Sequence, residues 1–399
     1  MNIIFNSKLF VDTLQNVKYL DEDAIILGLK ERGAFWGIPY TVNKIASNSV
    51  VRQLLIILFP LILISYLLLK FLITGIKATL RKKKQLKVDS YYILAAPFSR
   101  SINNRINKHA SNACWILNDG INEKDYIIPS GKFVCSYELI GIIDIFLSVI
   151  ESFVAYILII RKYGTYYMLA SLNAFRWLNY LKTCNHIPDS SVIYFNNHKD
   201  RWAFLEDTIT CKYKILIQHG TEVSNCDEDL ARKRGMLHVV GGGWTQNLPH
   251  KYQTLNEVIT FSDKEFSAMS QSIFHGSPEC VIGGYGFETY PLESDKYSVL
   301  IIAHSGIYYD IEKKLIDLLS QLSIDLYVKN HPTQSNEKYE ELLKVYKFHL
   351  ITEQKFPHVN KVITYDSTLA HEYMSVGIDV IYHTNRSVEQ IVEAIKVEL

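Results

Sequence analysis

The sequence contains an apolar run of 23 residues from Leu54 to Ile76, interrupted by a single charge at Lys70. At ~1.5 Å per residue, an α-helix of this length reaches across a hydrocarbon layer of ~30 Å. Pro60 lies inside the run, so a kinked or re-entrant helix is an alternative to a straight span. A buried core helix is a further alternative, but such helices rarely stay apolar on every face for this long. The run therefore predicts a membrane helix over 54–76.

Basic residues follow the apolar run directly, at positions 77, 81–84 and 87. By the positive-inside rule they stay on the cytoplasmic side, so we expect the protein at the inner (cytoplasmic) membrane with its globular part facing the cytoplasm. A second apolar stretch over 139–160 carries Asp144 and Glu151, and two acids make a lipid span costly. We expect this stretch to form an interfacial helix or a core helix.

From Asp89 onward, short β-rich runs alternate with helical segments, and 399 residues are enough for two domains. The first half has expected strands at 91–97, 191–197, 213–219, 237–242 and 257–262. The second half has expected strands at 297–305, 324–330, 348–352, 361–366 and 379–383, with helices between them. This interleaving indicates parallel sheets with helices on both faces. The predicted fold class is α/β, with Rossmann-like domains over 89–285 and 286–399 after an N-terminal membrane segment, 1–88.

Two polar motifs stand at strand ends in the second half, where parallel sheets bind ligands. In Lys329-Asn330-His331-Pro332 the imidazole could donate a hydrogen bond to a phosphate oxygen, although a loop histidine with a local role is the alternative. Ser367 and Thr368 begin the helix after 361–366, where free N–H groups and the helix dipole attract anions. An ordinary N-cap would use the same residues.

Glu372 lies one turn further along that helix and could reach the ribose hydroxyls of a nucleotide, or could be an exposed helical acid without a role. In the first half, His219 ends the strand 213–219 within the motif QHGT. It is a candidate general base for an acceptor hydroxyl, with a structural loop histidine as the alternative. The polar segment 196–202 follows another strand and offers four candidates for acceptor binding: Asn197, His198, Asp200 and Arg201.

Several function classes lack support. A formal net charge of +1 gives no reason to expect nucleic acid. The three glycines at 241–243 do not form a dinucleotide-binding fingerprint, and no nucleotide-binding P-loop, zinc-protease, hydrolase or kinase signature occurs. We expect no cofactor and no metal, since no DxD pattern stands at a strand end.

The order of the motifs, QHGT, TFSDKEF, a glycine-rich link, VKNHP and YDSTLAHEYMSVGIDVIY, resembles surface-polysaccharide transferases of the GT-B fold. The likeness covers residues 190–385 and is closest to the group that contains CDP-glycerol glycerophosphotransferases and the capsule Kdo and sialic acid transferases. This resemblance implies that His219 is the base and that His331 contacts the donor phosphate. It also implies that Ser367 and Thr368 form the phosphate-binding turn and that Glu372 faces the ribose.

The sequence also departs from this group. Glu222-Val223-Ser224 follows the HGT motif where glycerophosphotransferases have Pro-Leu-Lys, and the paired-acid motif of sialyltransferases is absent. The resemblance implies transfer of a sugar from a CMP-, CDP- or UDP-linked donor to a lipid-linked or polysaccharide acceptor at the membrane, in the synthesis of capsule or O antigen. Lys329 would help to stabilise the departing phosphate. The alternatives are a glycerophosphotransferase and a non-catalytic membrane scaffold.

Overall fold

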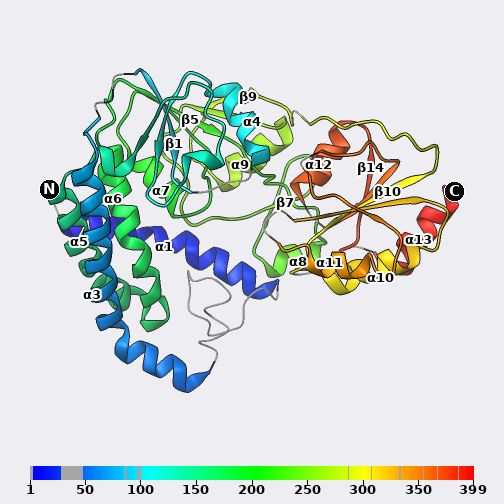
Figure 1. The fold of residues 1–399 in the computed structure, drawn as a ribbon, viewed down its shortest axis with the longest axis horizontal. Coiled ribbons are helices and arrows are strands. Elements are labelled where there is room, and N and C mark those ends of the chain that lie inside the picture. Colours follow the sequence, from blue (N-terminus) through cyan, green and yellow to red (C-terminus); the bar gives the residue numbers. More distant parts are fainter. Residues whose placement is uncertain are drawn as a thin grey trace. The chain divides into compact units, whose positions relative to one another are not determined.

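The computed structural model describes residues 3–27, 48–84, 86, 88–96, 100–285, 287–306, 308–331, 334–353, 355–365, 367–384 and 386–399. The chain divides into two compact units (Figure 1). Unit 1 comprises Met1–His219, Gln246–Thr260 and Phe266–Val281, and unit 2 comprises Gly220–Thr245, Phe261–Glu265 and Ile282–Leu399. The expected boundary at 285/286 differs from this division, because two earlier segments, Gly220–Thr245 and Phe261–Glu265, belong to unit 2.

Unit 1 is built on a seven-stranded sheet with the order β3-β2-β1-β4-β5-β8-β9. The pairs from β3 to β8 are all parallel. The strands are β1 (Ser90–Leu94), β2 (Cys114–Leu117), β3 (Phe133–Cys135), β4 (Val192–Phe195), β5 (Tyr213–Ile217), β8 (Glu257–Thr260) and β9 (Glu279–Ile282). β2 is buried along its whole length, as expected of a strand covered on both faces. The strand order reverses between β1 and β4, and this switch point is where doubly wound sheets form their ligand crevice.

Unit 2 has a five-stranded parallel sheet with the order β12-β11-β10-β13-β14. Its strands are β10 (Ser298–Ala303), β11 (Asp325–Asn330), β12 (His349–Leu350), β13 (Lys361–Thr364) and β14 (Asp379–Tyr382). Its helices are α8 (Glu228–Lys233), α10 (Tyr309–Leu319), α11 (Glu337–Leu342), α12 (Thr368–Ser375) and α13 (Val388–Val397). The switch point lies between β10 and β13. The two parallel sheets confirm the predicted class of two Rossmann-like α/β domains.

One predicted strand, 237–242, is wrong. Only β6 (Leu237–His238) forms, and it pairs antiparallel with β7 (Trp244–Thr245) outside both main sheets. Gly241, Gly242 and Gly243 all have φ between 88° and 94°, a conformation that side chains with a Cβ rarely adopt. The glycines therefore make a tight hairpin turn, and the apolar run before them is too short for a central strand.

The helices of unit 1 include the predicted membrane helix. Helix α3 (Ser49–Leu80) contains the whole run 54–76 and continues through Pro60. The remaining helices are α1 (Ile3–Ile26), α4 (Arg100–His109), α5 (Ile142–Tyr163), α6 (Ala174–Cys184), α7 (Arg201–Thr208) and α9 (Asp263–Ser272), with short 3₁₀ helices η1 (Glu123–Asp125), η2 (Ser136–Glu138) and η3 (Thr165–Asn173). The first three residues of α9 belong to unit 2. By length and composition, α3 and α5 are the two helices of the described chain that could cross a membrane.

Helix α1 was not predicted, and it packs on α5 and α6. Its buried side chains Phe10, Leu14 and Val17 recur at helical spacing and join the core of unit 1. Helix α5 carries Glu151, which is fully buried and forms an ion pair with Lys182 of α6. The predicted alternative of a core helix therefore describes this face of α5, because the acid is neutralised inside the protein rather than exposed to lipid.

Candidate functional site

Three neighbouring strands of unit 2 end at the same edge of the sheet and bring aromatic side chains together there. His331 follows β11, His304 follows β10 and Tyr365 follows β13. The ring centroids of His304 and His331 are 5.0 Å apart, and those of His304 and Tyr365 are 5.7 Å apart. His331 therefore lies at the predicted edge of the sheet, where His304 is its direct neighbour and Tyr365 lies beside His304.

The backbone around His331 is held by the residue before it. The Asn330 side-chain oxygen accepts hydrogen bonds from the His331 N–H at 2.9 Å and from the Ser305 N–H at 3.1 Å. The Asn330 amide group donates to the Ser335 carbonyl at 2.8 Å. Burial and the neighbouring His304 both lower the pKa of His331, so its imidazole is neutral at pH 7. A neutral imidazole offers one N–H donor, which suits a phosphate oxygen.

Below these residues lies a buried carboxyl, that of Glu312 on α10. Its Oε1 accepts the His304 backbone N–H at 2.7 Å, and its Oε2 is hydrogen-bonded by the Tyr339 hydroxyl. The Nε2 atom of His383, at the end of β14, is 3.9 Å from Glu312 Oε1. Burial raises the pKa of Glu312 to about 7 and lowers the pKa of His383 to about 4. His383 is therefore neutral at pH 7, and the contact is a polar one rather than a full ion pair.

Ser367 and Thr368 lie at the start of α12, as predicted. Ser367 is the N-cap residue, but its side chain makes no capping hydrogen bond. The Thr368 hydroxyl accepts the backbone N–H of Thr221 at 3.3 Å, and a Cβ added to Gly220 would lie 3.8 Å from the same oxygen. The segment that begins at Gly220 thus packs against the N-terminus of α12, where backbone N–H groups favour an anion. Asp366 and Pro332 lie outside the described residues.

Two other predicted residues of unit 2 have different surroundings. The Lys329 ammonium group donates to the carbonyls of Ile351, at 3.3 Å, and Glu353, at 2.8 Å. It therefore holds the loop after β12, which competes with the predicted contact to a donor phosphate. Glu372 lies in the second turn of α12 and is half-buried. Its contact with a ribose stays a prediction.

In unit 1 the structure brings two predicted histidines together. His219 follows β5, and His198 follows the adjacent strand β4. Their ring centroids are 4.4 Å apart, and both Nδ1 atoms approach the Asn196 carbonyl, at 2.6 Å for His219 and 3.1 Å for His198. A hydrogen bond from Nδ1–H to a carbonyl fixes the tautomer that carries the lone pair on Nε2. This is the tautomer that a general base at His219 requires.

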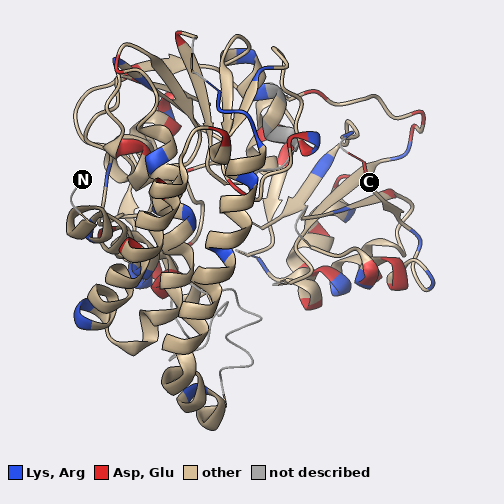
Figure 2. Cartoon of the chain, turned by 60° about the vertical axis from the view of Figure 1, so that its left-hand side comes forward, with Lys and Arg blue, Asp and Glu red and all other residues tan. Residues whose placement is uncertain are grey.

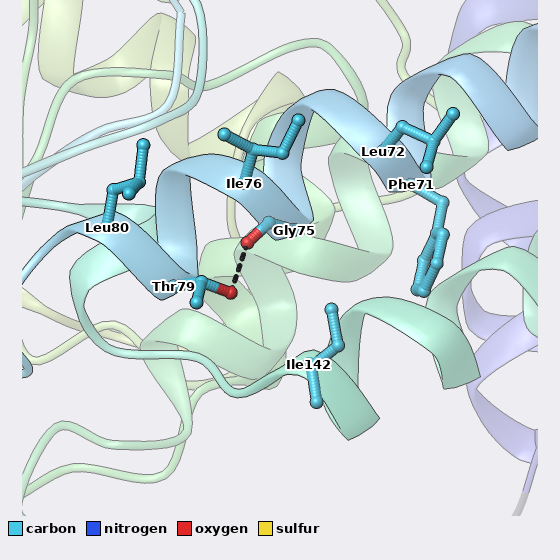
Figure 3. A pocket seen from close by; sticks show the side chains of 7 residues that line it. All are labelled: Phe71, Leu72, Gly75, Ile76, Thr79, Leu80 and Ile142. Carbon is cyan, nitrogen blue, oxygen red and sulfur yellow. Dashed lines mark hydrogen bonds between the residues drawn. The ribbon is translucent and has the colours of Figure 1, made fainter.

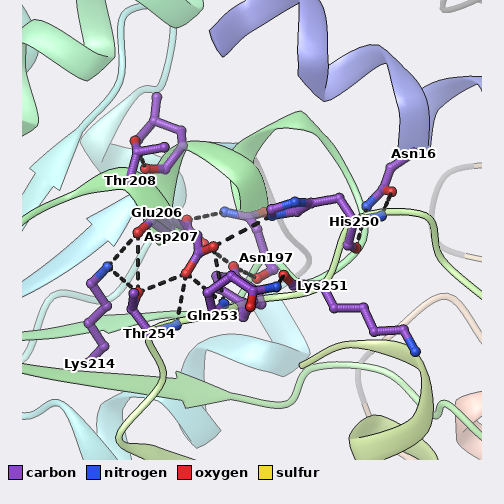
Figure 4. Close-up of polar contacts among 12 residues, drawn as sticks. Asn16, Asn197, Glu206, Asp207, Thr208, Lys214, His250, Lys251, Gln253 and Thr254 are labelled. Carbon is purple, nitrogen blue, oxygen red and sulfur yellow. Dashed lines mark hydrogen bonds and ion pairs between the residues drawn. The ribbon is translucent and has the colours of Figure 1, made fainter. Parts of the chain in front are cut away.

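The other residues predicted to bind an acceptor support the loop itself. Asn197 donates to the buried Glu206 carboxyl at 2.8 Å (Figure 4). The Tyr252 hydroxyl donates to the other oxygen of that carboxyl at 2.9 Å. Asp200 caps α7 by accepting the Trp202 N–H at 2.9 Å. The Arg201 carbonyl accepts the Trp177 indole N–H at 2.7 Å, and burial lowers the pKa of the Arg201 guanidinium.

A second polar cluster lies next to Glu206 in the same view. Asp207 accepts hydrogen bonds from the N–H groups of Gln253, at 3.0 Å, and Thr254, at 3.1 Å (Figure 4). Asn16 of α1 exchanges two hydrogen bonds with the backbone of His250. These contacts tie α1 and the loop 250–254 to α7, and so fix the segment that presents His198.

Three residues of this cluster were not predicted from the sequence: His304, Glu312 and His383. His383 ends the predicted strand 379–383 and His304 is the last residue but one of the predicted strand 297–305, so their positions carried the same signal as His331. Glu312 carried none, because an acid in the first turn of a helix ordinarily faces solvent. Within the described part of the chain, no three His, Cys, Asp or Glu side chains are grouped to hold a metal ion. The expectation that the site works without a metal stays a prediction.

No family model and no curated protein matches the chain. Solved structures are similar to it at 10–11% sequence identity. The wall teichoic acid polymerase TagF has a TM-score of 0.40 and covers 81% of this chain and 77% of its own. The calicheamicin glycosyltransferase CalG4 has a TM-score of 0.38, covering 78% of this chain and 90% of its own. Anabaena HepE in complex with UDP-glucose has a TM-score of 0.37, with coverages of 73% and 79%. The structures that this chain is similar to thus include a cell-wall polymerase, a named glycosyltransferase and a protein bound to a nucleotide sugar.

Proposed function

We propose that the protein is a glycosyltransferase that moves a sugar from a nucleotide-linked donor to an acceptor carried at the membrane, in the synthesis of a surface polysaccharide such as capsule or O antigen. One observation carries the proposal: in unit 2, His331, His304 and the N-terminus of α12 follow three adjacent parallel strands. Neutral N–H donors and a positive helix end at one sheet edge suit a diphosphate. The order of the sequence motifs supports the same class of donor.

In the proposed reaction, unit 2 binds the nucleotide donor. The acceptor hydroxyl oxygen forms the new bond to the anomeric carbon, while the bond from that carbon to the donor phosphate breaks. His219 takes the hydroxyl proton on Nε2. The His331 N–H and the backbone N–H groups at the start of α12 stabilise the negative charge that develops on the departing phosphate. Such fixed donors are usually the largest contribution that a transferase makes to its rate.

Thermal unfolding with and without nucleotides tests the donor site. We expect CMP, CDP or UDP to raise the melting temperature of the full chain, since a ligand that binds only the folded state stabilises it by ~2.7 kcal/mol at a hundredfold excess over Kd. His331→Ala should abolish the increase. His358→Ala is the matched control, because His358 is an exposed histidine of the same unit. No response to CMP, CDP, UDP or GDP would refute the proposal.

Transfer itself is tested with the nucleotide that binds and a membrane fraction as acceptor. Release of free nucleotide together with labelled sugar in the lipid or polymer fraction is the expected result, and His219→Gln should reduce it at least a hundredfold, the typical contribution of a general base. Incorporation of label from CDP-glycerol in place of sugar would assign the protein to glycerophosphoryl transfer. Nucleotide binding without any transfer would leave a non-catalytic scaffold.

A further inference from the structure

Helices α3 and α5 of unit 1 expose an apolar surface that the globular core does not cover. We call it the apolar face, and its members are the exposed side chains Leu54, Ile57, Leu58, Leu61, Ile62, Leu68, Leu69, Leu72, Ile73 and Ile76 of α3, and Ile142, Ile143, Phe146, Phe153 and Ile157 of α5. Leu61 is 65% exposed and Ile143 is 72% exposed. Figure 2 shows the long helices of this unit with few charged residues along their length. A continuous apolar surface of this kind marks a contact with lipid or with another protein.

The two helices run antiparallel and form one layer. The rings of Phe59 and Tyr156 are 5.7 Å apart, and those of Phe71 and Phe146 are 6.2 Å apart, so increasing residue numbers on α3 meet decreasing numbers on α5. A Cβ added to Gly75 would lie 3.0 Å from the Ile142 side chain, so glycine permits the close approach there. The apolar face therefore lies on one antiparallel pair of helices, which we call the α3–α5 pair, rather than on two separate patches.

The opposite side of α5 is polar, and this limits how the α3–α5 pair can insert into a membrane. Glu151 is buried there with Lys182, and it also accepts a hydrogen bond from Asn6 at 2.9 Å. Lys162, the next-to-last residue of α5, lies on the same side about three turns further along and pairs with Asp12 of α1 at 2.7 Å. Helix α1 also exposes charged side chains to solvent, among them Lys8. If α5 crossed the bilayer, Glu151 near its middle, the paired Lys182 and the neighbouring Lys8 of α1 would lie at the depth of the hydrocarbon layer, where a charged side chain costs ~2.5–3.5 kcal/mol or more.

Length and charge support the same conclusion. The exposed apolar side chains of α3 extend from Val50 to Leu80, which is ~45 Å at 1.5 Å per residue and exceeds a hydrocarbon thickness of ~30 Å. Basic residues lie at both ends of the α3–α5 pair. Lys77 and the run 81–84 lie at one end, and Arg52 and Arg161 lie at the other. A spanning helix concentrates its basic residues on one side, whereas a helix in the membrane plane brings both ends to the headgroups.

We propose that the apolar face inserts into one leaflet of an anionic membrane. The α3–α5 pair then lies parallel to the membrane surface, and neither helix crosses the bilayer. Phe71, Ile76 and Ile142 are among seven residues that line an apolar pocket of about 310 Å³ on this face (Figure 3). The polar group at the pocket, the Thr79 hydroxyl, is already bonded to the Gly75 carbonyl at 2.8 Å. The pocket therefore accepts a hydrocarbon chain and offers no donor to a polar ligand. This inference is independent of the proposed transferase activity.

Flotation with vesicles tests the surface and its partner. The full chain, diluted from mild detergent, should float with phosphatidylcholine vesicles that contain 30% phosphatidylglycerol, and less with phosphatidylcholine alone, because each basic residue near an anionic surface strengthens binding about fivefold. Leu61→Glu with Leu68→Glu should reduce flotation at least tenfold. Val345→Glu with Val397→Glu is the matched control, since both valines are exposed on unit 2. Circular dichroism verifies that each variant is folded.

Two results of the flotation experiment would overturn the proposal. One is binding of the Leu61→Glu, Leu68→Glu variant that equals that of the unmodified chain. The other is a chain that forms a discrete dimer without lipid and ignores vesicles, since the apolar face would then be a contact between two copies.

Labelling of sealed vesicles distinguishes insertion in the membrane plane from spanning. Single cysteines are introduced as Ser49→Cys and Lys82→Cys, at the two ends of α3, after Cys211, Cys226 and Cys280 have been replaced by serine. A membrane-impermeant maleimide added outside should label both positions to the same extent before and after the vesicles are opened with detergent. Protection of one position until detergent is added would show that α3 spans the bilayer and would refute the proposal.

Discussion

Replacing Glu312 by glutamine changes one buried group of the unit 2 cluster without changing its shape. The glutamine oxygen can still accept the His304 N–H that now bonds Glu312 at 2.7 Å, and the amide group can still meet the Tyr339 hydroxyl. What the substitution removes is a carboxyl whose pKa burial raises to about 7, against the opposing effect of the hydrogen bonds from the Tyr339 hydroxyl and the His304 N–H. We therefore expect its effect on stability to depend on pH.

The magnitude follows from the two pKa values in the cluster. Glu312 has a folded pKa above its ordinary value of 4.5, so the stability it contributes is full below pH 4.5 and is lost as the pH rises to about 7. At ~1.36 kcal/mol per pKa unit this is a loss of ~3 kcal/mol. His383 has a folded pKa of about 4, below its ordinary 6.5, so its contribution has the opposite sign, and ~3 kcal/mol is gained as the pH rises from 4 to 6.5. The two changes nearly cancel in the unmodified protein.

In Glu312→Gln the Glu312 titration is removed, whereas the titrations of His383, His304 and His331, whose pKa values burial lowers, remain in both proteins. Between pH 4.5 and 7 the unfolding free energy of unit 2 should therefore rise by ~3 kcal/mol more in the variant than in the unmodified protein. Hydrogen exchange of peptides from β10 and β14, corrected for the intrinsic effect of pH, measures this in the full chain. Glu340→Gln, at an exposed position of α11, is the control and should follow the unmodified protein. Parallel pH profiles for Glu312→Gln and the unmodified protein would refute the assignment of a raised pKa to this carboxyl.

Five further substitutions, in three experiments, test contacts that stabilise the two units. Phe10→Ala should lower the unfolding free energy of unit 1 by ~3–5 kcal/mol, because the ring is fully buried; denaturant unfolding followed by circular dichroism measures this, and a loss below 1 kcal/mol would mean that α1 is not docked. Lys182→Met should cost ~3–5 kcal/mol by leaving Glu151 unpaired, and adding Glu151→Leu should restore much of it; a double-mutant cycle with no coupling would disprove the pair. Asp200→Ala should cost ~1 kcal/mol through the lost cap of α7, whereas Ser367→Ala, which loses no capping bond, should change the melting temperature little; equal losses would contradict the geometry of α12.

The sequence was most informative where a strand is apolar throughout. The strands β10, β11, β13 and β14 were all predicted, since a parallel sheet covered on both faces requires near-continuous apolar runs. The strands β2 and β3 were missed, because runs of four and three residues between long loops carry no periodic signal. Helix α1 was missed because its buried face includes Ser7 and Asn16, whose partners lie more than a hundred residues away in the chain.

The candidate site could be predicted in part for a related reason. A histidine at the carboxyl end of a strand is visible in the sequence, and the structure confirms that His331 lies at such an end. Its neighbours depend on register, which pairs Ala303 of β10 with Asn330 of β11 and so places His304 beside His331. The contact between Glu312 and His383 further requires that α10 packs against β10 at one particular rotation. No local pattern specifies that rotation, since it is set by tertiary packing.

The division of the chain between the units has a consequence for its synthesis. The polypeptide passes from one unit to the other at 219/220, 245/246, 260/261, 265/266 and 281/282. The edge strand β9 of unit 1 is made only after Gly220–Thr245, which belongs to unit 2, has left the ribosome. That segment must wait for the remaining residues of its own unit, including Thr368, against which Thr221 packs. Neither unit is a contiguous gene fragment, so a truncation placed between residues 285 and 286 separates each unit from part of what completes it.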